Sequence, residues 1–141
     1  MLNHITTGLL ATLAYGAVGI VLLGLGYLMI DLVTPGRLGT LIWTNRNRNA
    51  AVVLVSGLLA VGTIITTAIV TSADDLGAGL ASTAAYGVLG LLFMALGFLL
   101  LDVATPGKLG ALLVDDRPHP AIWVSSAINL ALGAIIAAAI S

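Results

Sequence analysis

Two stretches of the chain combine an acid, a helix breaker and a base within seven residues. The first runs Asp-Leu-Val-Thr-Pro-Gly-Arg-Leu-Gly from Asp31, and the second runs Asp-Val-Ala-Thr-Pro-Gly-Lys-Leu-Gly from Asp102. Each carboxylate follows a long apolar run, and an ionisable group in apolar surroundings often marks a site for a cation or a proton. The candidate site residues are Asp31, Thr34, Pro35, Gly36, Arg37, Asp102, Thr105, Pro106, Gly107 and Lys108.

Two interpretations of this turn motif remain open. In the first it is a hairpin clasp, in which the acid, the threonine hydroxyl and the base satisfy free helix carbonyls and each other. Proline restrains the preceding threonine to extended geometry, and glycine takes a positive φ in the turn. In the second, Asp31 and Asp102 face each other and line a cation or proton entrance. An acid at a helix C-terminus opposes the helix dipole, so we expect Arg37 or Lys108 to compensate it.

The composition indicates that lipid is the solvent of this chain. Its 141 residues are 60% hydrophobic and 8% charged, whereas a soluble domain is about 45–50% apolar and about 25% charged. The formal net charge of −1 argues against a nucleic-acid partner, which requires clustered Lys and Arg. The absence of cysteine excludes disulfides, thiolate metal sites and thiol nucleophiles.

Four apolar runs are long enough to cross a bilayer, which takes about 20 residues of helix. These runs cover approximately residues 8–33, 50–71, 76–104 and 121–140. The runs are continuous, whereas strands of a membrane barrel are shorter and alternate in polarity. The sequence therefore predicts an all-α integral membrane protein with four transmembrane helices.

The second half of the chain repeats the first. Tyr86 follows Tyr15 by 71 residues, and the same offset relates Ile140 to Ile69, with about 27 identities over 70 aligned positions. We therefore predict two tandem helical-hairpin repeats, residues 1–71 and 72–141. Each repeat contains two spans, so both copies enter the membrane in the same direction and are parallel repeats.

The positive charges predict the orientation. All Lys and Arg residues lie in the two connections within the repeats: Arg37, Arg46, Arg48, Lys108 and Arg117. The positive-inside rule places both connections, with their Thr-Pro-Gly turns, in the cytoplasm. We therefore expect a multi-pass protein of the plasma membrane with both termini outside.

Small residues in the first and third spans predict close helix packing. They fall on one stripe at steps of three, four and seven residues, and small residues allow helices to approach each other in lipid. The residues concerned are Gly16, Gly19, Gly26, Gly87, Gly90 and Gly97. We expect a four-helix bundle with the first and third spans together at its centre. A homodimer through the same stripe, or contact with another membrane protein, is the alternative use.

The sequence contains no pattern typical of an enzyme. There is no serine–histidine–acid set, no phosphate-binding glycine loop and no metal-ligand spacing, so we predict no catalytic, cofactor-binding or metal site. His4 and His119 fall on opposite sides of the membrane and cannot share a metal. Asn129 is interpreted as a hydrogen-bonding contact between helices. Asp74 and Asp75 are interpreted as solvated loop acids.

The doubled D-x-x-T-P-G-[RK]-L-G motif resembles the bacterial membrane family known as domain of unknown function 350, or uncharacterised protein family 0719. YjfL-type inner-membrane proteins belong to it. The resemblance covers almost the whole chain and includes Asn49-Ala50, where the second repeat departs and reads Pro120-Ala121. It implies a small multi-pass protein of the bacterial plasma (inner) membrane and implies no activity.

From these observations the expected function is that of a non-enzymatic scaffold or accessory subunit that acts through helix packing in the lipid bilayer. The alternative is a small-cation or proton conduit that uses the paired aspartates Asp31 and Asp102. Polar residues on the inner faces of all four spans would favour the conduit. The predicted inner faces are mostly Gly, Ala and Thr, which favours close packing.

Overall fold

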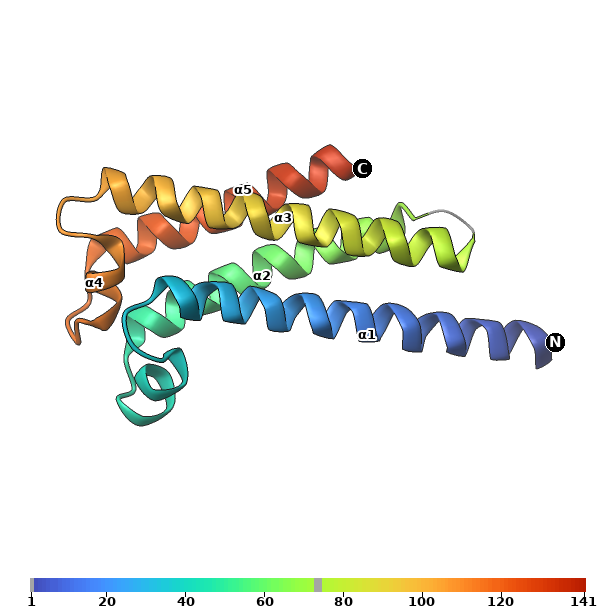
Figure 1. Cartoon of the computed structure of the whole chain (residues 1–141), viewed down its shortest axis with the longest axis horizontal. Coiled ribbons are helices and arrows are strands. Elements are labelled where there is room, and N and C mark those ends of the chain that lie inside the picture. The colour runs from blue at the N-terminus through green and yellow to red at the C-terminus, as the bar shows by residue number, and fades with distance from the viewer. Residues whose placement is uncertain (1, 73–74) are drawn as a thin grey trace.

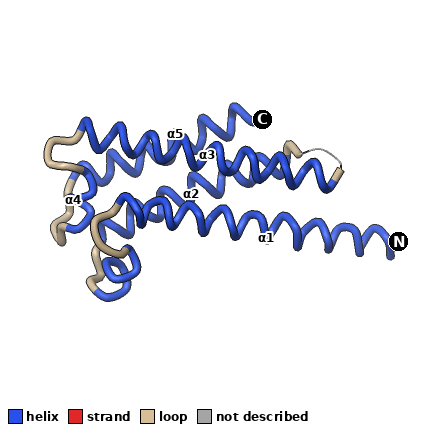
Figure 2. The backbone as a smooth tube through the Cα atoms, in the orientation of Figure 1, coloured by secondary structure: helices blue, strands red, loops and turns tan. Residues whose placement is uncertain are grey.

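The computed structural model describes residues 2–72 and 75–141, and within these ranges the chain forms helices and no strand (Figures 1 and 2). The four long helices are α1 (Leu2–Val33), α2 (Arg48–Val70), α3 (Leu76–Ala104) and α5 (Pro120–Ile140). Two short segments, the π-helix η1 (Thr40–Thr44) and α4 (Leu109–Val114), lie in the connections. The prediction of an all-α protein is confirmed.

Each of the four long helices is long and apolar enough to span a membrane, which confirms the four predicted spans. The shortest, α5, has 21 residues and measures about 31 Å at 1.5 Å per residue. The hydrocarbon core of a bilayer is about 30 Å thick. α1 has 32 residues, begins earlier than predicted, and projects beyond the other helices at its N-terminus (Figure 1).

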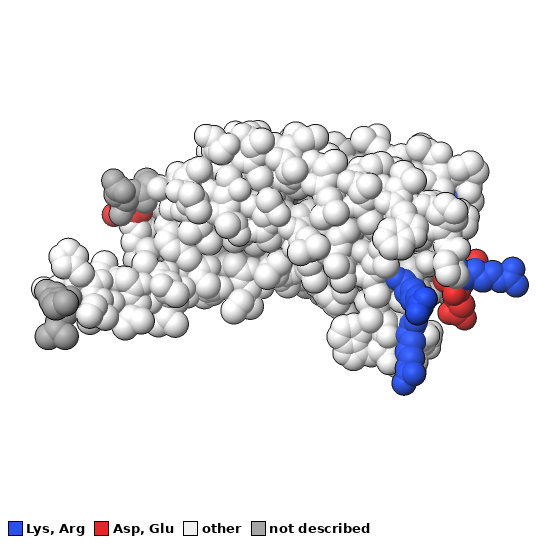
Figure 3. Space-filling model, turned by 180° about the vertical axis from the view of Figure 1, so that it is seen from behind, with Lys and Arg blue, Asp and Glu red and all other residues white. Residues whose placement is uncertain are grey.

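The helices run side by side, so the molecule has two distinct ends (Figure 1). The connection end carries both Thr-Pro-Gly turns, η1 and α4. The link end carries both termini and the passage from α2 to α3. On the face seen in Figure 3, Lys and Arg side chains project from the connection end, and the long middle of the molecule shows no charged side chain. Large apolar side chains of the long helices are exposed, including Leu13 and Ile20 of α1 and Leu92 of α3, as expected of a surface in contact with lipid.

The centre of the bundle differs from the one that the glycine stripe predicted. α2 packs most extensively against α5, and α2 also contacts both α1 and α3. Half of the most apolar stretch of α2 is buried, against 17% of that of α1. The expectation of the first and third spans at the centre is therefore wrong. A close approach of the two backbones agrees with this, because a methyl group added at Gly133 of α5 would lie 2.7 Å from Cα of Ala60 in α2.

The six glycines of the predicted stripe have different surroundings. In α3, Gly87, Gly90 and Gly97 each receive a side chain of a neighbouring helix, from Leu22, Ile64 and Leu132 respectively. In α1, Gly26 lies against Leu91 and Val61, and Gly19 makes a looser contact with Ile65. Gly16 has no atom of another residue close to where a side chain would begin. The stripe is thus packed within the bundle in α3 and only partly packed in α1.

Two apolar clusters form the core. The first lies at the connection end, where helix ends, η1 and α4 meet: Ile30, Leu38, Leu41, Ala50, Val53, Leu54, Phe98, Leu109, Leu113 and Ile122. The second lies nearer the link end: Leu22, Ala60, Val61, Ile64, Ile65, Leu91, Met94 and Ile136. The short segments of the connections therefore fold inward and contribute to the core that positions both turn motifs.

Candidate functional site

Both turn motifs end their helices as the proline predicts. α1 ends at Val33 and α3 at Ala104, and Thr105 has the extended backbone expected before proline (φ −91°, ψ 119°). Gly36 and Gly107 have φ values of 95° and 100°, in the left-handed region that glycine tolerates. The hydroxyls of the two motif threonines donate to the carbonyls four residues earlier, both at 2.7 Å. The threonines thus satisfy free carbonyls at the helix C-termini.

The two aspartates bond to backbone rather than to the motif bases. Oδ1 of Asp31 accepts a hydrogen bond of 2.7 Å from the N–H of Leu38, where the short helical segment of the first connection begins. Oδ1 of Asp102 lies 3.5 Å from the N–H of Gly110 at the start of α4. In the described ranges no ion pair joins either acid to Arg37 or Lys108. Each acid instead faces the positive end of the next short helix, which offsets its unfavourable place at the end of a long one.

The two motifs lie against each other, but the contact is not symmetric. A methyl group at Gly110 would lie 3.0 Å from Cδ of Pro35 and 3.2 Å from the carbonyl of Val33, so the start of α4 packs on the first turn. The counterpart of Gly110 in the first repeat, Gly39, faces the Tyr27 hydroxyl at 3.6 Å. The connection end therefore brings the two turns together without giving them equivalent neighbours.

Two asparagines tie the first connection to the second. Nδ2 of Asn49 lies 2.8–3.2 Å from the carbonyl oxygens of Leu112, Asp115 and Arg117. Nδ2 of Asn47 lies 3.2 Å from those of Val114 and Asp115. Oδ1 of Asn47 also caps α2 by accepting from the N–H of Ala50. Both side chains are buried, and their amide nitrogens donate hydrogen bonds to carbonyls that remain free at and just after the C-terminal end of α4.

Within the described ranges, the other polar residues singled out in the sequence either make hydrogen bonds within the fold or are exposed. Asn129 donates to the Ser56 hydroxyl at 3.2 Å and joins α5 to α2, as its interpretation as an interhelical contact predicts. His119 and Asp75 cap the N-termini of α5 and α3 by accepting backbone N–H groups. His4 is exposed on α1. Asp74 lies outside the described residues. Within the described ranges, no group of three or more His, Cys, Asp or Glu side chains is close enough to hold a metal ion.

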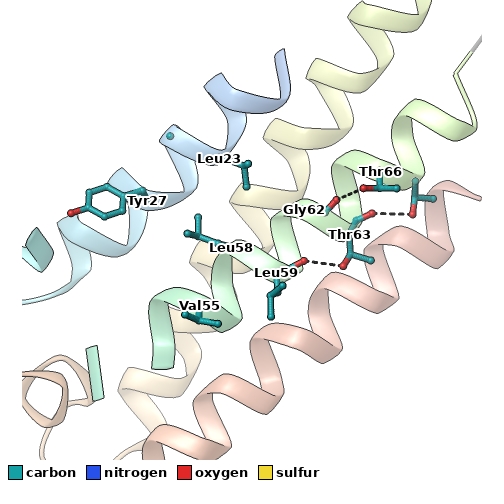
Figure 4. Close-up of a pocket in the computed structure, with 10 residues that line it drawn as sticks. Leu23, Tyr27, Val55, Leu58, Leu59, Gly62, Thr63 and Thr66 are labelled. Carbon is teal, nitrogen blue, oxygen red and sulfur yellow. Dashed lines mark hydrogen bonds between the residues drawn. The ribbon is translucent and has the colours of Figure 1, made fainter. Parts of the chain in front are cut away.

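A long groove runs between α1 and α2 and is made of two adjoining hollows that share Leu23. The hollow nearer the connection end, shown in Figure 4, has a volume of about 860 Å³, and the other has about 520 Å³. Small residues line it: Gly16, Gly19, Gly24, Gly62 and Thr63. The hydroxyls of Thr63, Thr66 and Thr67 donate to carbonyls of their own helix, drawn as dashed lines in Figure 4. The α1–α2 groove is therefore nearly apolar.

Sequence reasoning did not assign the contacts of Asn47 and Asn49, nor the buried hydroxyls that have no partner. The hydroxyls of Thr83, Ser125 and Ser126 are buried and make no hydrogen bond within the described part of the chain. A signal for some of these sites exists in the repeat itself. Position 49 is Asn where the second repeat has Pro120, and position 54 is Leu where the second repeat has Ser125. The two halves therefore differ at both of these positions.

Comparison with known proteins gives a family for the whole chain. The family model described as Domain of Unknown Function (DUF350) matches residues 4–140. A UPF0719 transmembrane protein of Mycolicibacterium paratuberculosis is 36% identical over 140 residues, which cover 99% of this chain and 93% of that protein. UPF0719 transmembrane proteins of Mycobacterium bovis and Mycobacterium tuberculosis are each 34% identical, with 92% of their length covered. No solved structure matches the chain. With four apolar helices and this match along its length, the chain is a multi-pass membrane protein of the DUF350 family, to which the UPF0719 transmembrane proteins are related.

Proposed function

We propose that this protein is a non-enzymatic membrane scaffold or accessory subunit that binds a transmembrane helix of another chain in the α1–α2 groove. The observation that carries the proposal is the groove itself. It extends from Ala11 to Tyr27 along α1, a distance of about 24 Å at 1.5 Å per residue. This is most of the thickness of the hydrocarbon core, so a crossing helix can follow the groove through the bilayer.

The residues along the groove suit a helix better than they suit a polar substrate. Helices associate in lipid through small residues that permit close backbone approach. Gly16, Gly24 and Gly62 have no heavy atom within 4 Å of where a side chain would begin, so the bundle does not use them for its own packing. The hydroxyls of Thr63, Thr66 and Thr67 already donate their protons to backbone carbonyls of α2. An apolar helix therefore meets no free hydroxyl proton from these three threonines on binding.

The conduit alternative has less support. A conduit requires polar groups that are free to contact an ion along a path through the membrane. Asp31 lies at the connection end, and its carboxylate already accepts the Leu38 N–H. The alternative has a direct test, because Asp31→Asn in a conduit changes the flux of a cation or proton into proteoliposomes at normal protein yield. A clasp predicts a lower yield of folded protein and an unchanged flux.

The mass of the complex released from membranes by a mild detergent tests the helix-binding proposal. The chain itself has a mass of 14.2 kDa, so the proposal predicts a larger mass, with either a second copy or another membrane protein accounting for the difference. Gly62→Leu places a side chain in the groove, at a position with room for it in the bundle. We expect this variant to fold and to run at the mass of the single chain.

The matched control is Ala134→Leu, which puts the same side chain on an exposed position of α5 that corresponds to Thr63 in the repeat. It should retain the complex. A single-chain mass for the unaltered protein, or equal retention by both variants, would remove the support for the groove as a binding surface.

We also propose that the connection end faces the cytoplasm. The support is that all five Lys and Arg residues of the sequence lie in the two connections, as the positive-inside rule requires of cytoplasmic loops. The chain has no cysteine, so single cysteines at Thr44 and at Ser141 can be labelled separately in intact cells. An impermeant thiol reagent should label Ser141→Cys and leave Thr44→Cys unlabelled. The reverse pattern would invert the proposed orientation.

A further inference from the structure

A second cavity, separate from the groove, lies at the connection end between the end of α3, α4 and the start of α5. Its volume is about 400 Å³, and Leu101, Thr105, Pro106, Leu109, Val124 and Ser125 are among the residues that line it. This volume is in the range of small-molecule sites, about 300–1,000 Å³. Most of the lining is apolar, so its polar side chains, Thr105, His119 and Ser125, determine what it can recognise.

Ser125 carries a hydroxyl that the fold leaves without a partner. The residue is 1% exposed, lines the cavity, and its Oγ makes no hydrogen bond in the described part of the chain. The other lining hydroxyl, that of Thr105, donates its proton to the carbonyl of Leu101, and Nδ1 of His119 accepts the N–H of Ala121. A buried hydroxyl without a partner is unfavourable, so a ligand that offers an acceptor to Ser125 gains what the protein alone leaves unsatisfied.

The first repeat fills the same position with an apolar side chain. The residue that corresponds to Ser125 is Leu54, which is 6% exposed and belongs to the core cluster of the connection end. The second repeat thus replaces a packed leucine by a small polar residue, and the space beside it remains open.

The depth of the cavity indicates which acceptor is available. Trp123 is 68% exposed, and exposed tryptophans of membrane proteins lie at the interface between lipid and water. Ser125 follows two residues later in α5, about 3 Å deeper along the axis. The ester carbonyls of glycerophospholipids lie at this boundary between headgroup and acyl chain. The loop before α5 carries Asp115, Asp116 and Arg117, so headgroup charge is not the selected feature.

We propose that this cavity binds one ester-linked glycerophospholipid, whose ester carbonyl accepts a hydrogen bond from the Ser125 hydroxyl while an acyl chain follows the apolar lining. The site is distinct from the α1–α2 groove and does not depend on the proposed helix partner. It recognises the carbonyl that ester lipids carry and ether lipids lack.

Native mass spectrometry of the full-length protein tests this after reconstitution in nanodiscs of diacyl phosphatidylcholine or of its dialkyl ether analogue. We expect the unaltered protein to retain one diacyl lipid about fivefold more than one dialkyl lipid, the size expected for one neutral hydrogen bond. Ser125→Ala should lower retention of the diacyl lipid to the level of the ether lipid. Ser125→Leu, which places in the cavity the residue that the first repeat has, should retain neither.

The matched control is Ser126→Ala. Ser126 is also buried with a hydroxyl that has no partner, but it lines a different hollow between α2 and α5, so this variant should keep the fivefold ratio. Because each ratio is measured within one folded variant, Ser125→Ala decides the matter even if Ser125→Leu fails to fold. Equal retention of both lipids by the unaltered protein, an unchanged ratio in Ser125→Ala, or an isoprenoid quinone bound in place of a phospholipid would overturn the proposal.

Discussion

In the first half of the chain the turn acid Asp31 accepts the N–H of Leu38 at 2.7 Å, whereas in the second half Asp102 lies 3.5 Å from the N–H of Gly110. The first connection sends two asparagine side chains into the second, and the second sends none back among the hydrogen bonds of the described residues. The first half also fills with Leu54 the place that Ser125 leaves open in the second. Two turns that share six of nine residues therefore have different surroundings.

This difference separates the residues that end the helices from the residues that determine the packing around each turn. The shared Thr-Pro-Gly residues end a long helix and reverse the chain in both halves. The residues that differ determine whether the region around the turn is closely packed or hollow. Even shared residues can differ in surroundings, since a methyl group added at Gly133 would meet Ala60, whereas one added at its counterpart Gly62 would meet nothing within 4 Å. Substitutions at corresponding positions are therefore the sharpest way to test the comparison.

The largest difference is expected for the pair Gly133→Ala and Gly62→Ala. At Gly133 the added methyl group meets the backbone of Ala60 at 2.7 Å, and backbone cannot move aside as a side chain can. We expect the free energy of unfolding to fall by about 3 kcal/mol, the upper range for overpacking. At Gly62 it should stay within about 1 kcal/mol of the original value or rise, since alanine favours helix. Unfolding in detergent measures both, and equal effects would contradict the asymmetric packing.

A smaller loss is expected for Asn49→Ala. The substitution removes the donor that lies within hydrogen-bond distance of three backbone carbonyls in the second connection. We expect a destabilisation of about 2 kcal/mol, because leaving buried polar groups unsatisfied costs about 1–3 kcal/mol. Hydrogen–deuterium exchange should also rise in the amides of residues 109–117.

The control for Asn49→Ala is the corresponding position in the second repeat, Pro120→Ala. Pro120 is the first residue of α5, where proline is favourable but not required, so we expect a change below about 0.5 kcal/mol. If Pro120→Ala destabilised the protein as much as Asn49→Ala, the link from the first connection to the second would not be the cause.

The smallest effects are expected for Asp31→Ala and Asp102→Ala. Removing a side chain that caps a helix N-terminus costs about 1 kcal/mol, and we expect this value for Asp31, whose hydrogen bond is 2.7 Å long. At Asp102 the distance of 3.5 Å is at the limit of a hydrogen bond, so a loss of a few tenths of a kcal/mol is expected. A larger effect at Asp102 than at Asp31 would reverse the comparison of the two turns.

Much of the fold follows from the sequence. Four apolar runs predict the four spanning helices, and the positions of Pro35 and Pro106 predict where α1 and α3 end. The sequence did not predict which helix lies at the centre of the bundle. In lipid the face that contacts a helix and the face that contacts acyl chains are both apolar, so the pattern does not show that α2, rather than α1, is central.

The candidate site was predictable only in part. The motif residues identify the turns and the positive φ of Gly36 and Gly107. The sequence favoured Arg37 and Lys108 as the partners of the two acids, because charges are visible in a sequence. The actual partners are backbone N–H groups of short helices, such as α4 with six residues, and such segments are too short to show a helical period.

Photo-crosslinking from α1 in intact membranes tests the proposed helix binding most directly. A benzophenone side chain at Gly16 points into the α1–α2 groove, and the same group at the exposed Leu92 of α3 points away from it. The account predicts that position 16 crosslinks to a transmembrane segment of another polypeptide and that position 92 crosslinks to lipid. Lipid adducts alone at both positions would contradict it.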